Sequence, residues 1–222
     1  LLSDMKGPRL HETIPDFHNV RKRFHNFVKS LEEDRFNRSK NAIKEIKFYL
    51  DHEPIVKKLE KALQSGDLPE RITHNDTKFN NVLLDTETDE EQCVVDLDTV
   101  MPGNILYDFG DMVRTTTSPT MEDELDLTKV KMRLPLFKAL ARGYLGATND
   151  ILTKKEKKLI AFSGKMMAFT IGLRFLTDYL SGDTYFRVHR PQHNLDRTRT
   201  QAKLTQSIER QEENMQKYVD SL

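Results

Sequence analysis

Short polar motifs in the middle of the chain have the residue types that phosphoryl transfer requires. In the segment THNDTKFNNVLLD, Asp76 is followed five positions later by Asn81, and in CVVDLD an apolar run ends at Asp96. Transfer of a phosphoryl group to a hydroxyl needs a carboxylate that accepts the hydroxyl proton, and oxygen ligands that hold Mg²⁺ on the phosphates. The spacing predicts that Asp76 is this base and that Asn81 and Asp96 converge on one magnesium ion.

Three neighbouring side chains each allow a structural and a catalytic interpretation. We interpret His74 as a structural residue that ties the loop to Asp96 or to backbone, rather than as a proton shuttle. Lys78 is either a solvated loop charge or a group that reaches the γ-phosphate of a nucleotide. Asp98 either binds the metal as well or hydrogen-bonds the loop. The sequence leaves the roles of Lys78 and Asp98 open.

A second candidate for the metal ligand is Asp108, because Asp108-Phe109-Gly110 spells the tripeptide that holds magnesium in protein kinases. This Asp lies beyond Pro102-Gly103 and is followed by FGDMVR, which looks like the first turn of a helix. A carboxylate there is well placed to accept backbone N–H groups, either capping its own helix or bracing the catalytic loop. We therefore predict that Asp96 binds the metal and that Asp108 gives structural support.

The elements that must position these groups form a strand-rich island between helical segments. The segments RIT, NVLLD and CVVDLD are short, apolar and β-branched, and TETDEE between the last two is typical of a hairpin turn. Thr153 to Glu156 matches a capping box that opens a long apolar helix from Lys154 to Leu180. Apolar spacing predicts further helices near 17–31, 42–50, 55–63 and 134–145, and one from about Leu195 onward. The fold class predicted is α+β, mainly α, as one unit over residues 1–222.

Composition excludes several classes of protein. The chain has 222 residues, with Lys plus Arg and Asp plus Glu at 35 each, so no overall charge draws it to nucleic acid or an anionic membrane. The single Cys93 excludes an internal disulfide, and no apolar run approaches the roughly 20 residues that span a bilayer. We expect a cytoplasmic protein that acts on small molecules, without a nucleic-acid or membrane partner.

Several segments together resemble a known superfamily. HNDTKFNN, VVDLDTV and YDFGDMVR are similar to the motifs of the aminoglycoside phosphotransferase and choline kinase-like superfamily. Within it, the chain most resembles the N-acetylhexosamine 1-kinases, including gut-bacterial relatives labelled mucin-desulfating. HETIPDFHNV and IGLRFLTDYLSGDTYFR extend this resemblance over nearly the whole chain. The resemblance implies the C-terminal lobe of a protein-kinase-like fold, with a small β-hairpin that carries the catalytic and metal loops.

The resemblance also implies roles for individual residues. It makes Asp76 the catalytic base, Asn81 and Asp96 the ligands of Mg²⁺, and Asp108 the brace of the catalytic loop. The implied reaction is ATP-dependent transfer of a phosphoryl group to a small-molecule hydroxyl, the anomeric hydroxyl of an N-acetylhexosamine. Asn75 stands where protein kinases carry Arg, and no Ala-Pro-Glu segment follows, so protein substrates are not expected.

The sugar itself is expected to contact the second half of the chain. Arg174 and Tyr185 match positions that contact the hexosamine in the sugar 1-kinases, which would explain an Arg in an otherwise apolar helix. The alternative for Arg174 is an ordinary buried ion pair with Asp178, one turn later.

Kinases of this kind clamp ATP between two lobes, and no strand-rich segment precedes His11. We therefore expect the ATP-clamping lobe to lie outside this sequence, the chain alone to be inactive, and the surface facing that lobe to be apolar and open to self-association. Two alternatives stay open. One is a kinase for another small alcohol, such as an aminoglycoside, homoserine or choline. The other is a catalytically dead scaffold, which the intact Asp76, Asn81 and Asp96 argue against.

Overall fold

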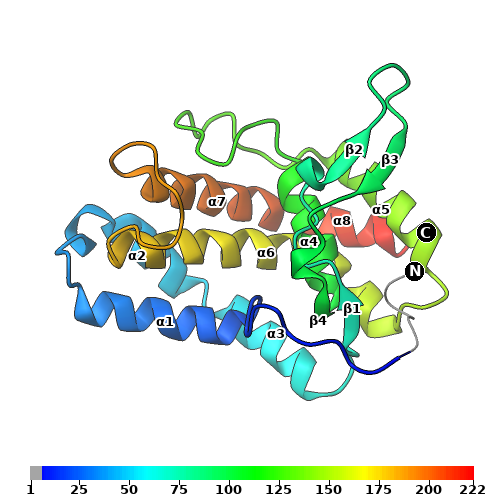
Figure 1. Cartoon of the computed structure of the whole chain (residues 1–222), viewed down its shortest axis with the longest axis horizontal. Coiled ribbons are helices and arrows are strands. Elements are labelled where there is room, and N and C mark those ends of the chain that lie inside the picture. The colour runs from blue at the N-terminus through cyan, green and yellow to red at the C-terminus, as the bar shows by residue number, and fades with distance from the viewer. Residues whose placement is uncertain (1–6) are drawn as a thin grey trace.

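The computed structural model describes residues 7–222, which form a mainly helical α+β fold with strands near its centre (Figure 1). The fold class agrees with the prediction. The helices are α1 (Val20–Glu33), α2 (Ile43–Asp51), α3 (Pro54–Gln64), α4 (Ile105–Thr116), α5 (Leu134–Thr148), α6 (Lys154–Leu180), α7 (His193–Glu209) and α8 (Glu212–Val219). The strands are β1 (Arg71–Thr73), β2 (Val82–Leu84), β3 (Glu91–Val94) and β4 (Met101–Gly103).

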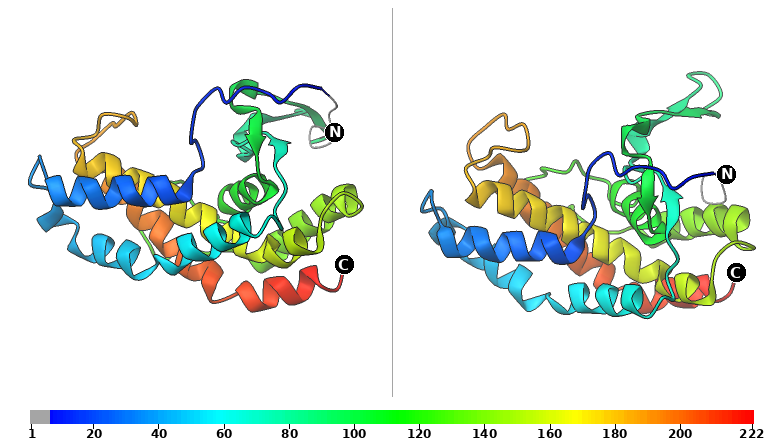
Figure 2. Two further views of the ribbon diagram at one scale, coloured as in Figure 1. Left: turned by 90° about the horizontal axis from the view of Figure 1, so that it is seen from below. Right: turned by 60° about the horizontal axis from the view of Figure 1, so that its bottom comes forward.

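Helix α6 is the central element of the core. It begins as predicted at a capping box, in which the Glu156 carboxylate accepts the Thr153 N–H at 2.7 Å and the Thr153 hydroxyl accepts the Glu156 N–H at 3.1 Å. Helices α1, α4 and α7 pack around it (Figure 2). By length and composition α6 could cross a bilayer, so the expectation that no such segment exists was too strong. However, 94% of its most apolar window is buried inside the protein, as in a core helix.

Two glycines allow neighbouring helices to approach α6 closely. A Cβ on Gly172 would lie 1.9 Å from the Tyr49 hydroxyl of α2 and 2.7 Å from the Gln201 Cβ of α7. A Cβ on Gly110 of α4 would lie 2.4 Å from the Ser163 carbonyl oxygen of α6. Because α4 carries Asp108, this second contact determines how far Asp108 lies from the core.

The strands form two separate antiparallel pairs. The expected hairpin is β2 with β3, and it projects from the helical body (Figure 1). Strand β1 pairs instead with β4, which places Thr73 opposite Met101. The sequence analysis did not predict β4, because Pro102-Gly103 is typical of a break rather than a strand. The pairing holds the start of the catalytic loop against the segment that leads into α4.

Two helix boundaries differ from the predicted ones. Helix α1 begins at Val20 rather than near Phe17, because the Asn19 side chain accepts the Lys22 N–H and caps the helix. The terminal helix is interrupted at Gln211, which separates α7 from α8. Phe17 and His18 therefore belong to a segment that precedes α1 and contacts the catalytic loop.

Several large apolar side chains of the hairpin and its flanking turns are exposed to solvent. Five of them are each between 36% and 58% exposed: Phe79, Leu83, Leu84, Val94 and Leu97. We call this set the exposed hairpin residues. The large apolar residues of α4 and α6 are, in contrast, mostly buried.

Candidate active site

The carboxylate of Asp76 is held by two neighbours in the loop that follows β1. Its Oδ2 accepts hydrogen bonds from Lys78 Nζ at 2.6 Å and from Asn81 Nδ2 at 3.1 Å. Asn81 Nδ2 also donates to the Asp76 carbonyl oxygen at 2.8 Å. With its nitrogen held in this way, the carboxamide of Asn81 directs its oxygen away from Asp76, where it can serve as a ligand.

Asp96 approaches the same place from the end of the hairpin. The Val95 N–H donates to the Asn81 carbonyl at 2.9 Å, which ties the two loops together. Asp96 itself adopts a left-handed backbone, with φ 61° and ψ 56°, a conformation that disfavours residues other than glycine. Its Oδ2 lies 3.7 Å from Lys78 Nζ. The structure therefore brings together Asp76, Lys78, Asn81 and Asp96.

Lys78 is a paired, partly buried cation rather than a solvated loop charge. Burial acts to lower the pKa of Lys78, but the hydrogen bond to Asp76 and the charges of Asp76 and Asp96 outweigh it and raise this pKa above its usual value. An ammonium group thus lies between two carboxylates. A metal ion or the phosphates of a nucleotide would meet the same set of charges.

The donor set around Lys78 suits a hard cation. The Asn81 amide oxygen and the Asp96 carboxylate are oxygen ligands, which Mg²⁺ prefers, and Mg²⁺ usually keeps water and phosphate oxygens as its other ligands. No group of three or more His, Cys, Asp or Glu side chains suited to a metal occurs within residues 7–222. A metal here would therefore depend on a bound nucleotide and water to complete its coordination.

Asp108 lies behind the catalytic loop and accepts backbone hydrogen bonds. Its Oδ1 accepts the Asn75 N–H at 2.7 Å and its Oδ2 the His74 N–H at 2.9 Å. Asn104, rather than Asp108, caps α4 by accepting the Leu106 N–H at 3.0 Å. Of the two interpretations left open by the sequence, bracing the loop is the one that these contacts match. Burial raises the pKa of Asp108 to about 6, although the two N–H donors act in the opposite direction.

His74 ties the loop to backbone, not to the Asp96 side chain. Its Nε2 lies 3.2 Å from the Val95 carbonyl oxygen, and its Nδ1 accepts the Asp76 N–H at 3.3 Å. A carbonyl only accepts and an N–H only donates, so in these contacts Nε2 is the donor and Nδ1 is the acceptor. His74 is thereby fully used in holding the backbone on both sides of the site.

Asp98 is not brought into this cluster. Its side chain is exposed, and its backbone carbonyl oxygen accepts the Thr13 hydroxyl at 2.8 Å. Within residues 7–222 its carboxylate has no hydrogen bond or ion pair with Asp76, Lys78 or Asn81.

Arg174 and Tyr185 both line a pocket that is separate from the cluster around Asp76. Arg174 Nη2 donates to the Tyr185 hydroxyl at 3.3 Å, and the guanidinium lies 5.1 Å from the centre of the Phe17 ring. The alternative for Arg174, an ion pair with Asp178, is not formed, because the Asp178 carboxylate accepts the Thr184, Tyr185 and Phe186 N–H groups and the Asn194 amide instead.

The pocket beside Arg174 is electropositive. It has a volume of about 200 Å³ and Arg23 also lines it. Burial lowers the pKa of Arg174 from its usual value and the nearby charge of Arg23 lowers it further. No ion pair to Arg174 occurs within the described residues 7–222. A buried guanidinium whose contacts are aromatic rings and a hydroxyl retains capacity to hydrogen-bond a ligand.

Phe17 and His18 connect this pocket to the catalytic loop, and sequence reasoning missed them. The Phe17 ring lies under Arg174, and His18 Nε2 is 2.7 Å from the Asn75 carbonyl oxygen, next to Asp76. The sequence pattern places Phe17 in the apolar stripe of a helix and gives His18 no role. The cap at Asn19 was the available signal, because an Asn before a periodic stripe is typical of a helix start.

Comparison with known families agrees with this arrangement. The family model described as APH, phosphotransferase enzyme family, matches residues 6–141. This is more than half of the 222 residues, and it includes Asp76, Asn81, Asp96 and Asp108, whereas Arg174 and Tyr185 lie outside it. The family implies phosphoryl transfer from ATP, typically with a divalent metal. This chain belongs to the phosphotransferase enzyme family.

Proposed function

We propose that this chain is the substrate- and metal-binding lobe of an ATP-dependent kinase that phosphorylates the anomeric hydroxyl of an N-acetylhexosamine. The observation that carries the proposal is the convergence of Asp76, Lys78, Asn81 and Asp96 through contacts of 2.6 to 3.7 Å. Membership of the family supports phosphoryl transfer to a small-molecule hydroxyl, and the sugar is our further proposal.

In this proposal Asp76 accepts the proton of the attacking hydroxyl. The bonds from Asn81 Nδ2 and Lys78 Nζ orient the carboxylate of Asp76. Asn81 and Asp96 would hold Mg²⁺, which supplies positive charge to the phosphates. Asp108 and His74 act as positioning residues, because they hold the backbone of the loop and touch no reacting atom.

The electropositive pocket supports a neutral sugar rather than a cationic acceptor. Arg23 and Arg174 both line it, and the carboxylate among its lining residues, Asp178, is occupied by backbone N–H groups. Aminoglycosides and choline are cations and would be repelled by two guanidinium groups. An N-acetylhexosamine is neutral and offers hydroxyl and amide oxygens to Arg174 and Tyr185.

The exposed hairpin residues support the proposal of an ATP-clamping lobe. Leu83, Val94 and Leu97 are 49% to 58% exposed, and Leu97 directly follows the proposed metal ligand Asp96 in the chain. Several exposed large apolar side chains on one element are typical of a surface that another domain covers. A lobe placed there would bring a nucleotide to the edge of the Asp76 cluster.

The test is a substrate panel with the full-length protein. ATP consumption is measured with N-acetylglucosamine and N-acetylgalactosamine, and beside them an aminoglycoside, homoserine and choline. The proposal predicts turnover with an N-acetylhexosamine and formation of its 1-phosphate. Turnover confined to the aminoglycoside, homoserine or choline would show that the sugar assignment is wrong, and absence of turnover with all five would contradict the kinase assignment.

A further inference from the structure

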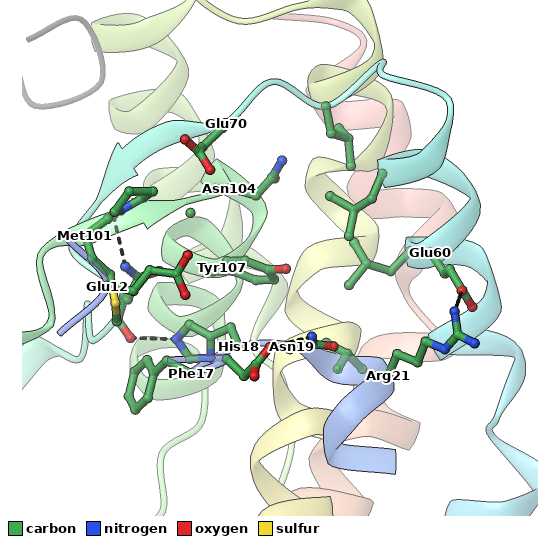
Figure 3. Close-up of a pocket in the computed structure, with 18 of the residues that line it drawn as sticks. Glu12, Phe17, His18, Asn19, Arg21, Glu60, Glu70, Met101, Asn104 and Tyr107 are labelled. Atoms are coloured by element: carbon green, nitrogen blue, oxygen red, sulfur yellow. Dashed lines mark hydrogen bonds and ion pairs between the residues drawn. The ribbon is translucent and has the colours of Figure 1, made fainter. Parts of the chain in front are cut away.

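The segment that precedes α1 places a buried histidine against the catalytic loop. His18 is 6% exposed, and its ring lies between the rings of Phe17 and Tyr107, at centroid distances of 4.5 and 5.1 Å (Figure 3). Burial lowers the pKa of His18 to about 4, so the ring is neutral at neutral pH. A neutral ring packed between two aromatic groups has a fixed direction for its one N–H donor.

This donor is directed at the peptide group between Asn75 and Asp76. His18 Nε2 lies 2.7 Å from the Asn75 carbonyl oxygen, and because a carbonyl only accepts, Nε2 is the donor. The N–H of the same peptide group, that of Asp76, donates to His74 Nδ1 at 3.3 Å. The peptide group that joins Asp76 to the loop is thus held at both ends by histidines, and His18 makes the shorter bond.

Asp108 holds the two preceding peptide groups instead. Its carboxylate accepts the N–H groups of His74 and Asn75, which belong to those groups. The Thr99 hydroxyl likewise donates at 2.6 Å to the carbonyl oxygen of His74, one peptide group before the one that His18 contacts. The bonds of His18 and His74 are therefore the ones that orient the last peptide plane before Asp76.

The orientation of this plane matters because Asn75 has a left-handed backbone, with φ 66°. This conformation disfavours residues other than glycine, so it persists only where contacts hold the peptide groups on both sides of the residue. Asp108 holds the group before Asn75, and His18 holds the group after it. Without His18, relaxation of Asn75 would turn the backbone that presents Asp76 and change the direction of its carboxylate.

The peptide group that precedes His18 is in turn held by residues of the electropositive pocket. The Phe17 carbonyl oxygen accepts Arg23 Nη2 at 3.0 Å and Arg23 Nε at 3.3 Å. The Phe17 ring lies 5.1 Å from the Arg174 guanidinium. Because Arg23 and Arg174 both line that pocket, His18 is placed by the residues that are proposed to face the acceptor.

We propose that His18 is a positioning residue of the phosphoryl-transfer reaction. It touches no reacting atom and acts through the Asn75–Asp76 peptide group, whose orientation it fixes. The inference rests on the role of Asp76 as the base in the proposed function, but not on the identity of the acceptor. It predicts that the N–H donor of His18, rather than the size or aromatic character of its ring, determines how Asp76 meets the attacking hydroxyl.

The experiment compares variants of the full-length protein with the acceptor that the substrate panel identifies. His18→Phe keeps an aromatic ring and removes the donor, whereas His18→Gln keeps an N–H donor. The matched control is His52→Phe, because His52 Nδ1 lies 2.8 Å from the Phe48 carbonyl oxygen, a ring-to-backbone contact of the same kind at the end of α2.

Steady-state kinetics should separate the three variants. We expect His18→Phe to lower kcat by roughly 10- to 100-fold, the scale on which misplacement of a catalytic group acts. KM for ATP and for the acceptor should stay nearly unchanged, because the lost interaction serves the transition state. His18→Gln should recover most of the wild-type kcat, and His52→Phe should match the wild type.

Hydrogen exchange of the same proteins, followed by mass spectrometry, reports on the loop without turnover. The amides of residues 74–76 should exchange roughly tenfold faster in His18→Phe than in the wild type, because a lost buried hydrogen bond makes local opening easier. The amides of α6 should be unchanged and show that the fold persists. His18→Leu, a smaller side chain without a donor, should behave as His18→Phe does and remains to be measured if His18→Phe does not fold.

Three results would overturn the inference: a wild-type kcat in a folded variant without the donor, loop amides of that variant that exchange no faster than in His52→Phe, or a His18→Gln protein that is as impaired. Absence of turnover by the wild-type protein would contradict the proposed function instead. Loop exchange would then still show whether His18 holds the Asn75–Asp76 peptide group.

Discussion

The carboxylate of Asp108 accepts the backbone N–H of Asn75 at 2.7 Å, from a partly buried position behind the loop that presents Asp76. The same carboxylate accepts the His74 N–H, so two consecutive peptide groups are fixed by one side chain. Asn75 needs such support, because its φ of 66° lies in the left-handed region. The Asp of the Asp-Phe-Gly tripeptide is thus a positioning residue, and the proposed metal ligand lies on the hairpin.

Asp108 should give the protein a pH-dependent stability of unusual sign. Burial raises the pKa of Asp108 from 3.8 to about 6, so the folded protein binds this proton more tightly than the unfolded chain. Its stabilising contribution is fully present below about pH 3.8 and is lost as the pH rises through about 6. The free energy of unfolding is measured by urea denaturation for the wild type and for Asp108→Asn. On acidification, the value for the wild type should rise relative to that of Asp108→Asn, by up to about 1.4 kcal/mol per pH unit.

Comparison with Asp108→Asn is needed because other carboxylates, such as that of Asp123, have lowered pKa values and destabilise the fold in acid. The difference between the two proteins removes their contribution. A difference that stays constant between pH 4 and pH 7 would contradict the assigned pKa.

Glu156 should be essential for the stability of the junction between β1 and α6. Its carboxylate is fully buried and accepts Arg71 Nε at 2.8 Å and Nη2 at 3.0 Å, while also closing the capping box. Glu156→Gln removes the charge that offsets the buried guanidinium and should lower the free energy of unfolding by about 3 kcal/mol. The matched change Glu213→Gln breaks a solvent-exposed pair with Lys217 and should have no measurable effect. Equal effects of the two variants in thermal or urea denaturation would show that the buried pair contributes nothing specific.

A pair of glycine substitutions should have opposite effects on stability. Gly172→Ala would place a Cβ 1.9 Å from the Tyr49 hydroxyl and should destabilise the protein by about 1–3 kcal/mol. Gly143→Ala on α5 meets no atom within 4 Å and should stabilise it by about 0.5–1 kcal/mol, since alanine favours a helix. Chemical denaturation measures both. If Gly172→Ala is neutral, helices α2, α6 and α7 do not cross as closely as described.

An element of this fold can be predicted from the sequence where the residues that determine it lie close together in the chain. The bounds of α6 follow from a capping box at Thr153 and from Ser181-Gly182 after its last turn, and all of these signals lie within a few residues of the ends. The chemistry of Asp76 and Asn81 also follows from one short segment. Strand β4 could not be predicted, because its partner β1 lies about thirty residues away and its own residues favour a break.

Arg174 should determine affinity for the acceptor rather than the rate of the chemical step. Arg174→Lys keeps the charge but loses the planar donors that face Tyr185 and the pocket. In the full-length protein we expect KM for the N-acetylhexosamine to rise about tenfold with kcat nearly unchanged. The control is Arg187→Lys, at an exposed arginine that does not line this pocket. Steady-state kinetics that show a fall in kcat at constant KM would place Arg174 outside the acceptor site.

The central claim is that Asp76 takes the proton of the acceptor hydroxyl. The most direct test is the turnover of Asp76→Asn in the full-length protein with ATP and N-acetylhexosamine, alongside a far-ultraviolet circular dichroism spectrum that reports on folding. The asparagine can still accept the bond from Asn81, so the fold should persist. The account predicts a wild-type spectrum and a kcat lower by roughly 10² to 10⁴, the usual contribution of a general base. A folded Asp76→Asn protein with wild-type turnover would contradict it.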